Sequence, residues 1–118
     1  MGGVKEITSD DLKALMDKGA DFLLIDLLGE KSYESLHVPQ AVPVQPGDGF
    51  VERVDALTGG DHGKQVIVYA ANFADELSTK MTWELLAAGY ENTLDFKGGL
   101  KDWAAELYPL EGKRVPKK

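Results

Sequence analysis

The sequence predicts an α/β fold in which a central, mainly parallel sheet lies between layers of helices. Two short, continuous apolar runs, over residues 22–25 and 66–69, indicate strands that are buried on both faces, as in a parallel sheet. Segments with helical periodicity separate the apolar runs along the chain. Strands that alternate with helices at this spacing are typical of layered α/β domains, so we expect a three-layer architecture.

The first half of the chain predicts three strands and three helices. Residues 8–11 carry side chains that cap helices, and residues 30–36 have a short helical pattern. The expected strands are an edge strand over residues 4–7 and further strands over 22–25 and 42–44. The first helix buries Leu12, Leu15 and Met16, and a short helical turn follows at residues 30–36. The last helix spans residues 50–57, and the side chains that face inward are Phe50, Val51, Val54 and Leu57. Gly59 and Gly60 end the last of these helices.

The second half predicts two further strands, each followed by a helix. The strand at residues 66–69 leads through a polar loop into a helix over 78–88, which Ser78 opens and Gly89 ends. Met81, Leu85 and Ala88 form its apolar stripe. A short strand over residues 93–96, a turn at 98–99 and a helix over 100–107 that buries Leu100 and Trp103 complete the pattern.

Length and composition indicate a single domain. The chain has 118 residues, of which 43% are hydrophobic and 28% charged, as in ordinary globular proteins. Neither an internal repeat nor a flexible linker divides it. We therefore expect one domain over residues 1–118, with a core at about 5–111 and a basic tail at 112–118 that frays from Lys113 onward.

The charge balance and the cysteine count exclude several functions. A net charge of −7 disfavours binding to nucleic acid or to an anionic membrane surface. No apolar stretch is long enough to span a bilayer and no secretory signal is visible, so we expect a cytosolic protein. Without cysteine, and with only His37 and His62 as imidazole ligands, the sequence predicts no metal site, and we expect no cofactor.

The loop after the strand at residues 66–69 is the leading candidate site. Ligands in parallel α/β folds collect at the carboxyl ends of strands, beside the amino termini of helices. A tight loop of small residues before a helix presents backbone N–H groups that stabilise an anion or a thiolate. An ordinary strand-to-helix connection, with Ser78 as the helix cap, would have the same local sequence.

Four segments in order along the chain resemble the rhodanese-like family. Residues 24–28 (LIDLL) resemble the strand-ending signature of the family, and residues 36–41 (LHVPQA) resemble its "GHIPGA" turn. Residues 66–70 (VIVYA) resemble "VVVYC", and residues 98–103 (GGLKDW) resemble "GGxxxW". The resemblance covers residues 7–111 and implies a rhodanese-type three-layer fold.

The resemblance also implies which residues form the active site. In rhodaneses a cysteine after this strand carries sulfur as a persulfide, and Ala70 holds its position in this chain. Asp75 replaces a second cysteine that some relatives have, and Leu28 replaces an arginine that contacts substrate in many. Lys80 is a second possible substrate contact. The implied active-site loop consists of Ala71, Asn72, Phe73, Ala74, Asp75, Glu76, Leu77 and Ser78.

Each of these residues also has a structural interpretation. Leu28 is interpreted as local packing, Lys80 as a solvated helix residue, and Asp75 and Glu76 as acids that complement the helix dipole. Asp26 is expected to tie the loop that follows it, and His37 to hold a turn. Trp83 and Trp103 are interpreted as packing residues.

Two functional hypotheses remain open at this point. The first is a rhodanese-type sulfurtransferase, which moves sulfur from a donor such as thiosulfate or polysulfide to a thiol or cyanide, with Ala70 as an engineered Cys-to-Ala replacement. The second is a naturally inactive binding or regulatory module. The expected partner is a small sulfur-containing anion or thiol acceptor, or a protein. A phosphatase ranks last, because residues 70–77 contain neither cysteine nor arginine.

Overall fold

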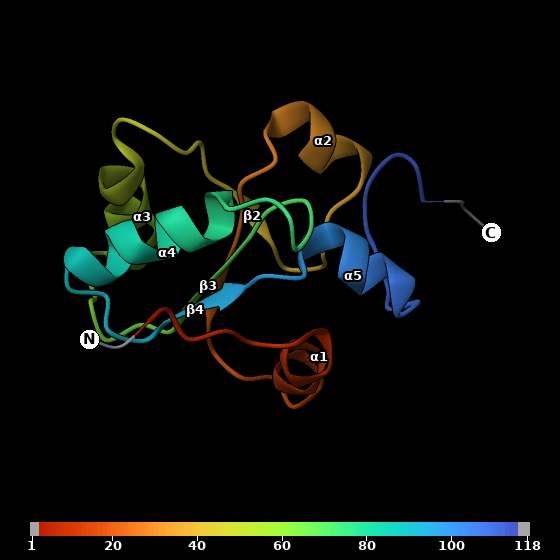
Figure 1. Cartoon of the computed structure of the whole chain (residues 1–118), viewed down its shortest axis with the longest axis horizontal. Coiled ribbons are helices and arrows are strands. Elements are labelled where there is room, and N and C mark those ends of the chain that lie inside the picture. The colour runs from red at the N-terminus through yellow and green to blue at the C-terminus, as the bar shows by residue number, and fades with distance from the viewer. Residues whose placement is uncertain (1–2, 116–118) are drawn as a thin grey trace.

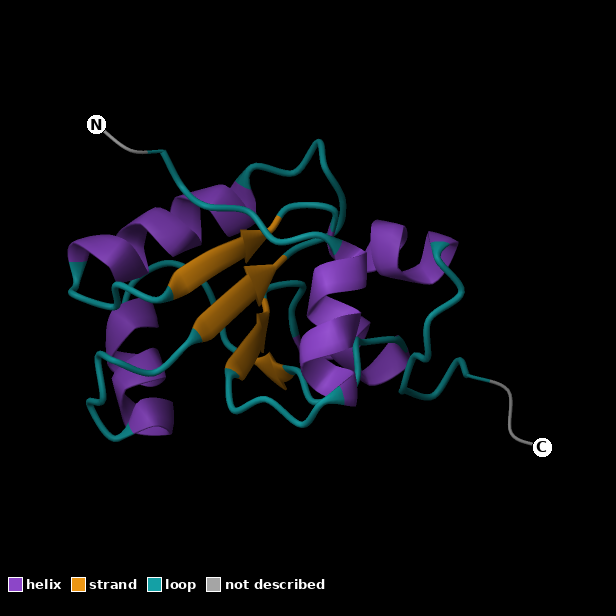
Figure 2. Ribbon diagram, turned by 90° about the horizontal axis from the view of Figure 1, so that it is seen from below, coloured by secondary structure: helices purple, strands orange, loops and turns teal. Residues whose placement is uncertain are grey.

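The computed structural model describes residues 3–115 and has a sheet of four parallel strands with helices on both sides (Figure 1, Figure 2). The strands are β1 (Leu23–Asp26), β2 (Val42–Pro43), β3 (Val66–Tyr69) and β4 (Thr93–Phe96), in the order β2-β1-β3-β4. Asp26 of β1 pairs with Tyr69 of β3, which pairs with Phe96 of β4. All the carboxyl ends therefore lie at one edge of the sheet.

Five helices connect or follow these strands in the described part of the chain. They are α1 (Ser9–Asp17), α2 (Glu30–Ser35), α3 (Phe50–Thr58), α4 (Leu77–Ala87) and α5 (Gly99–Ala105). The predicted α/β class, with a parallel sheet between helices, is confirmed. None of the helices within residues 3–115 has the length and apolar character needed to cross a bilayer.

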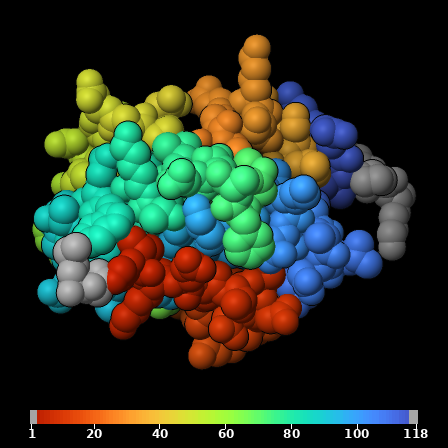
Figure 3. Space-filling view, in the orientation of Figure 1, coloured from red at the N-terminus to blue at the C-terminus, as the bar shows by residue number. Residues whose placement is uncertain are grey.

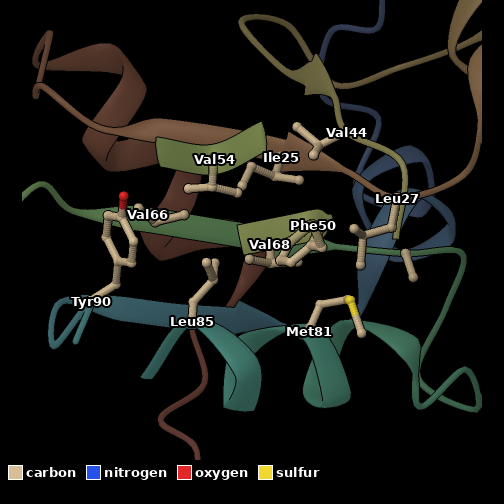
Figure 4. Close-up of a cluster of buried hydrophobic side chains, with 11 residues drawn as sticks. Ile25, Leu27, Val44, Phe50, Val54, Val66, Val68, Met81, Leu85 and Tyr90 are labelled. Atoms are coloured by element: carbon tan, nitrogen blue, oxygen red, sulfur yellow. The ribbon is translucent and has the colours of Figure 1, made fainter. Parts of the chain in front are cut away.

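Two hydrophobic clusters hold the helices to opposite faces of the sheet. Val66 and Val68 of β3 belong to one cluster, whereas Ile67 and Tyr69 belong to the other, as the alternation of side chains along a strand requires. The first cluster is covered by α3 and α4, and Figure 4 shows Met81 and Leu85 of α4 pointing toward β3. The second cluster contains Leu12 of α1 and Trp103 of α5.

Helix ends follow the expected local chemistry in most places. The Thr8 hydroxyl accepts a hydrogen bond from the Asp11 amide at 3.1 Å, which caps α1 as predicted. Gly59 takes the left-handed conformation that ends α3, with a φ of 68°. Gly89, with a φ of 101°, follows α4. These glycines fix where the chain turns back toward the sheet.

Three sequence predictions are wrong in detail. The edge strand expected over residues 4–7 is reduced to one bridge between Glu6 and Asp95 beside β4. Leu57 is 47% exposed rather than core-facing, because the last turn of α3 faces a cavity that no described element fills. The helix expected over residues 100–107 ends at Ala105, and Leu107 is 90% exposed.

The segment after α5 is hydrogen-bonded to α2. The amides of Lys113 and Arg114 donate to the carbonyls of Glu34 and Ser35 at 2.8 and 3.0 Å. The predicted fraying from Lys113 stays a prediction. Residues 116–118 of the predicted tail lie outside the described residues. The domain boundaries stay a prediction.

Candidate functional site

The loop after β3 begins at the carboxyl edge of the sheet, where ligands bind in folds of this class. Ala70 follows Tyr69 directly, and α4 begins at Leu77, so the loop spans residues 70–76. The strand ends at Asp26 and Phe96 lie on either side of Tyr69. In the space-filling view the loop, coloured green, is exposed between α4 and α5 (Figure 3).

The base of the loop is fixed against the start of α5. The Leu100 and Lys101 amides donate to the carbonyls of Ala70 and Ala71 at 3.1 and 2.9 Å. Gly99 has a φ of 65°, and a Cβ placed on it would lie 2.4 Å from the Ala70 carbonyl oxygen. Only glycine lets the two backbones approach this closely, which explains the glycine at residue 99.

Ala70 is enclosed in the core. Its exposed fraction is 1%, and it belongs to the same hydrophobic cluster as Leu27 and Met81. It lines neither of the two hollows beside the loop. A methyl group cannot ionise or carry sulfur, so this position supplies no thiol chemistry. Burial in apolar surroundings would also raise the pKa of a thiol placed there, whereas a nearby helix start would lower this pKa.

Several amides of the loop are already bonded within the loop itself. The Ala74 amide donates to Asn72 Oδ1 at 2.9 Å, and the Asp75 amide donates to the Asn72 carbonyl at 3.1 Å. The Leu77 amide, at the start of α4, donates to Asp75 Oδ1 at 3.0 Å. The Asp75 carboxylate thus accepts a hydrogen bond from an N–H group that could otherwise bind an anionic substrate. This agrees with the interpretation of Asp75 as an acid that complements the helix dipole.

Two hollows flank the loop. One, of about 330 Å³, lies between the loop and α5 and is lined by Asn72, Phe73 and Lys101 among others. The other, of about 630 Å³, lies along α4 and is lined by Asp75, Glu76, Lys80 and Trp83 with their neighbours. Lys80 thus lines the same hollow as Asp75 and Glu76.

The structure bears on the structural interpretations of Leu28 and Ser78, whereas their roles in a site stay predictions. Leu28 is half-buried and packs against the second hydrophobic cluster, which supports the packing interpretation. Ser78 does not open α4, because the helix begins at Leu77 and Glu76 stands at the N-cap without a side-chain bond. The Ser78 hydroxyl is buried and has no partner among the described residues. The prediction of a serine cap is wrong.

The carboxyl group of Asp26 is buried beside the base of the loop and makes one contact that was expected and one that was not. Asp26 Oδ1 accepts from the Leu28 amide at 2.7 Å, which confirms that Asp26 ties the loop after it. Asp26 Oδ2 accepts from the Tyr69 hydroxyl at 2.5 Å, and the same hydroxyl accepts from the Val38 amide at 3.1 Å. Burial raises the pKa of Asp26, and the hydrogen bond from Tyr69 partly offsets this. The sequence did contain a signal for the contact between Asp26 and Tyr69, because each is the last residue of a predicted or observed strand and the two strands pair in the sheet.

His37 holds a turn, as predicted. Its ring stacks on Tyr33 with centroids 3.8 Å apart, and Nδ1 lies 2.6 Å from the Tyr33 carbonyl oxygen. Nε2 lies 3.4 Å from a Glu111 carboxylate oxygen, and the two residues also form a backbone bridge. His37 therefore links α2 to the C-terminal segment.

The two tryptophans have different environments. Trp103 is fully buried beside Phe96 and donates Nε1–H to the Pro109 carbonyl at 2.7 Å, so its packing role is confirmed. Trp83 is 42% exposed on α4, so its interpretation as a packing residue stays a prediction. Phe73, in the loop, is 62% exposed. The predicted stripe of Met81 and Leu85 does face the sheet, which leaves Trp83 on the other side of α4.

Comparison with known proteins gives a consistent family assignment. A family model described as a rhodanese-like domain matches residues 8–106, which is most of the chain. This chain belongs to the rhodanese-like domain family. The four motifs around residues 24–28, 36–41, 66–70 and 98–103 all lie within the matched span.

Solved structures of rhodanese-like proteins superpose on the chain. The Alr3790 protein of Anabaena has a TM-score of 0.78 at 28% identity, covering 92% of this chain and 94% of that one. A thiosulfate sulfurtransferase of Pseudomonas aeruginosa has a TM-score of 0.77 at 25% identity, covering 92% of this chain and 20% of that one. The BH2092 protein of Bacillus halodurans has a TM-score of 0.83 at 23% identity, covering 93% of this chain and 78% of that one, and supports the fold alone.

One curated relative also matches. It is an uncharacterized 16.5 kDa protein of Synechococcus elongatus, 36% identical over 66 residues that make up 51% of this chain. The chain spans about 43% of the length of this relative. The family match and the Pseudomonas structure relate the domain to thiosulfate sulfurtransferases, and its sequence contains no cysteine.

Proposed function

We propose that this rhodanese-like domain is a non-catalytic module that binds a protein partner through the exposed surface around its loop. We call this surface the loop face and define it as Phe73, Asp75, Glu76, Lys80 and Trp83. The observation that carries the proposal is the enclosure of Ala70, because the position that transfers sulfur in relatives has neither a thiol nor an opening here.

The exposed aromatics of the loop face support a protein partner. Phe73 and Trp83 are among the four exposed large hydrophobic residues of the described chain, and each lines one of the hollows beside the loop. Exposed aromatic side chains are enriched at protein interfaces, where tryptophan often contributes most of the affinity. Each hollow that flanks the loop therefore has one exposed aromatic side chain, which favours a docking role.

The charge of the loop face indicates what the partner presents. Asp75 and Glu76 outnumber Lys80 in the hollow beside Trp83, and the whole chain carries a net charge of −7. A basic side chain of the partner would pair with these carboxylates and stack on the Trp83 ring. The partner therefore presents lysine or arginine next to an apolar residue.

The expected cytosolic location stays a prediction.

A random heptapeptide display library, selected on the immobilised domain, tests this proposal. We expect enrichment of peptides that combine basic and apolar residues. The affinity of an enriched peptide should fall in Trp83→Ala and Phe73→Ala and stay unchanged in Leu107→Ala, which removes an even more exposed apolar side chain elsewhere. Enrichment of acidic peptides, no enrichment, or equal affinity in all three variants would reject the proposal.

The sulfurtransferase hypothesis is the second candidate, because the support of the nucleophile position is intact. Gly99 and the amides of Leu100 and Lys101 still hold the backbone of Ala70 and Ala71 in place. If Ala70 replaces a cysteine, then Ala70→Cys should gain one sulfur atom from thiosulfate or polysulfide as a persulfide and lose it to cyanide. Intact-mass measurement detects both steps. An Ala70→Cys protein that gains no sulfur favours the binding module.

A further inference from the structure

A cavity of about 380 Å³ lies at the outer edge of the sheet and shares no lining residue with the two hollows beside the loop. It is bounded by β2 and the residues that follow it, by the later turns of α3 and by the start of α2. Figure 1 shows α3 and α2 together in the upper part of the molecule, around β2. Its volume lies within the range of about 300–1,000 Å³ that is usual for small-molecule sites.

The walls of this edge cavity are mainly apolar. Val42, Pro43 and Val44 form one wall, and Ala56 and Leu57 form the other. The 47% exposure of Leu57 arises here, because its side chain faces the open cavity. An apolar body bound in the cavity would cover this side chain and gain hydrophobic stabilisation.

The edge strand is unsuited to pairing with a strand of another protein. Val44 donates its amide to the Asp26 carbonyl at 3.1 Å, so the amide position of the preceding residue faces away from the sheet. That residue is Pro43, which has no N–H group to donate. A small molecule is therefore a better occupant of this edge than an extended peptide.

Arg53 is held in place beside the apolar walls. Its Nη2 group donates to the Gln45 carbonyl, and its backbone amide donates to the Gly49 carbonyl at 3.0 Å. Gly49 has a φ of 82°, and a Cβ on it would lie 2.8 Å from Arg53 Nη1. The absence of a side chain at Gly49 leaves room for the guanidinium, so its orientation is preorganised.

Arg53 has no acidic partner among the described residues. None of the ion pairs within residues 3–115 involves it, although the chain has twenty acidic and thirteen basic residues. Its Nε group is buried without an acceptor. An arginine that is fixed by backbone contacts, lines a cavity and lacks a carboxylate partner is well suited to hold a carboxylate from outside.

We infer that the edge cavity binds a small aliphatic monocarboxylate, with its carboxylate on Arg53 and its body against Pro43 and Leu57. Glu30 also lines the cavity and is exposed. Its negative charge opposes anions, and the opposition grows with the charge of the ligand. A single carboxylate with an apolar body fits this arrangement better than a phosphate or a dicarboxylate.

Hexanoate and its neutral analogue hexanamide are suitable probes. We would titrate each into the full chain labelled with ¹⁵N and follow the backbone amide resonances of residues 42–57. Hexanoate should bind about tenfold more tightly than hexanamide, because only the acid forms a charge-assisted pair with the guanidinium. The largest shifts should come from α3 and from the residues after β2.

Three substitutions assign the effect to named side chains. Arg53→Met should reduce hexanoate affinity about tenfold and leave hexanamide binding unchanged. Glu30→Gln should strengthen hexanoate binding, a gain that nonspecific association would not produce. Arg114→Met removes the only other arginine of the chain, which does not line this cavity, and should have no effect.

Equal affinity for the acid and the amide, or no binding of either, would overturn the inference. So would shifts confined to the loop face, or an unchanged hexanoate affinity in Arg53→Met. If Arg53→Met does not fold, Leu57→Glu replaces it, because residue 57 is exposed and a carboxylate there should abolish hexanoate binding. The peptide selection tests the loop face, which is a separate surface. The proposed function and the carboxylate site can therefore be rejected independently of each other.

Discussion

The base of the loop after β3 and its exposed part are only a few residues apart but differ in how the structure constrains them. At the base, Ala70 is 1% exposed and its carbonyl accepts from the Leu100 amide. Farther along, Phe73 is 62% exposed and lines an open hollow. The backbone at the base is held in place by hydrogen bonds, whereas the exposed part of the loop and the start of α4 present aromatic and acidic residues.

The support of the base should be the most sensitive to substitution. Gly99→Ala adds a Cβ at 2.4 Å from the Ala70 carbonyl oxygen and strains a φ of 65°, so we expect a loss of roughly 2–5 kcal/mol in the free energy of unfolding. Gly60→Ala is the matched control, since Gly60 has a φ of 79° and open space around its Cβ position. It should cost only about 1–2 kcal/mol. Urea unfolding measures both, and equal losses would show that the base is not tightly packed.

Thiol reactivity compares the base with the exposed part of the loop directly. A thiol introduced by Ala70→Cys should react with an aromatic disulfide reagent about tenfold or more slowly than one introduced by Phe73→Cys, because only the second is exposed and solvated. Absorbance of the released thiolate gives both rates. Similar rates would indicate that the base opens readily, and would strengthen the sulfurtransferase hypothesis.

The buried carboxyl beside the base should make stability depend on pH. Since burial raises the pKa of Asp26 above 3.8, the folded state holds this proton more tightly than the unfolded chain does. The stability contributed by the protonated carboxyl is present below pH 3.8 and is lost as the pH rises through the raised pKa. Asp26→Asn cannot ionise, so its cost relative to the unmodified chain should shrink over this range.

Urea unfolding at several pH values checks the prediction for Asp26. Tyr69→Phe serves as a second variant, because it removes a hydrogen bond that lowers the pKa of Asp26. The loss of stability with rising pH should then extend to higher pH. A cost of Asp26→Asn that stays constant, or that grows with pH, would contradict the assignment.

His37 lies outside the loop and should affect stability alone. His37→Ala removes the contacts to Tyr33 and Glu111 and should lower the free energy of unfolding by about 0.5–1.5 kcal/mol. Peptide binding to the loop face should stay unchanged. His62→Ala, at an exposed imidazole, is the matched control for stability. Lost peptide affinity with unchanged stability would show that His37 belongs to the binding surface.

The sequence determined the layered fold because its signals are local. Continuous apolar runs such as residues 66–69 require burial on both faces, and the glycines at 59 and 89 end helices through their own backbone freedom. The absence of cysteine likewise excludes thiol chemistry whatever the fold. The role of Asp26 in tying the following loop was also predictable, because its amide partner at Leu28 is two residues away.

Only the tertiary structure decided which surfaces are covered. Leu57 fits the pattern of a core residue, but no described element packs over it, because periodicity reports the face of a helix rather than its neighbours. Gly99 and Ala70 are distant in sequence, and their close approach depends on how α5 packs beside β3. The unpaired Arg53 depends equally on the folded chain, because it is packing in three dimensions that leaves no carboxylate of the described residues within ion-pairing distance of it.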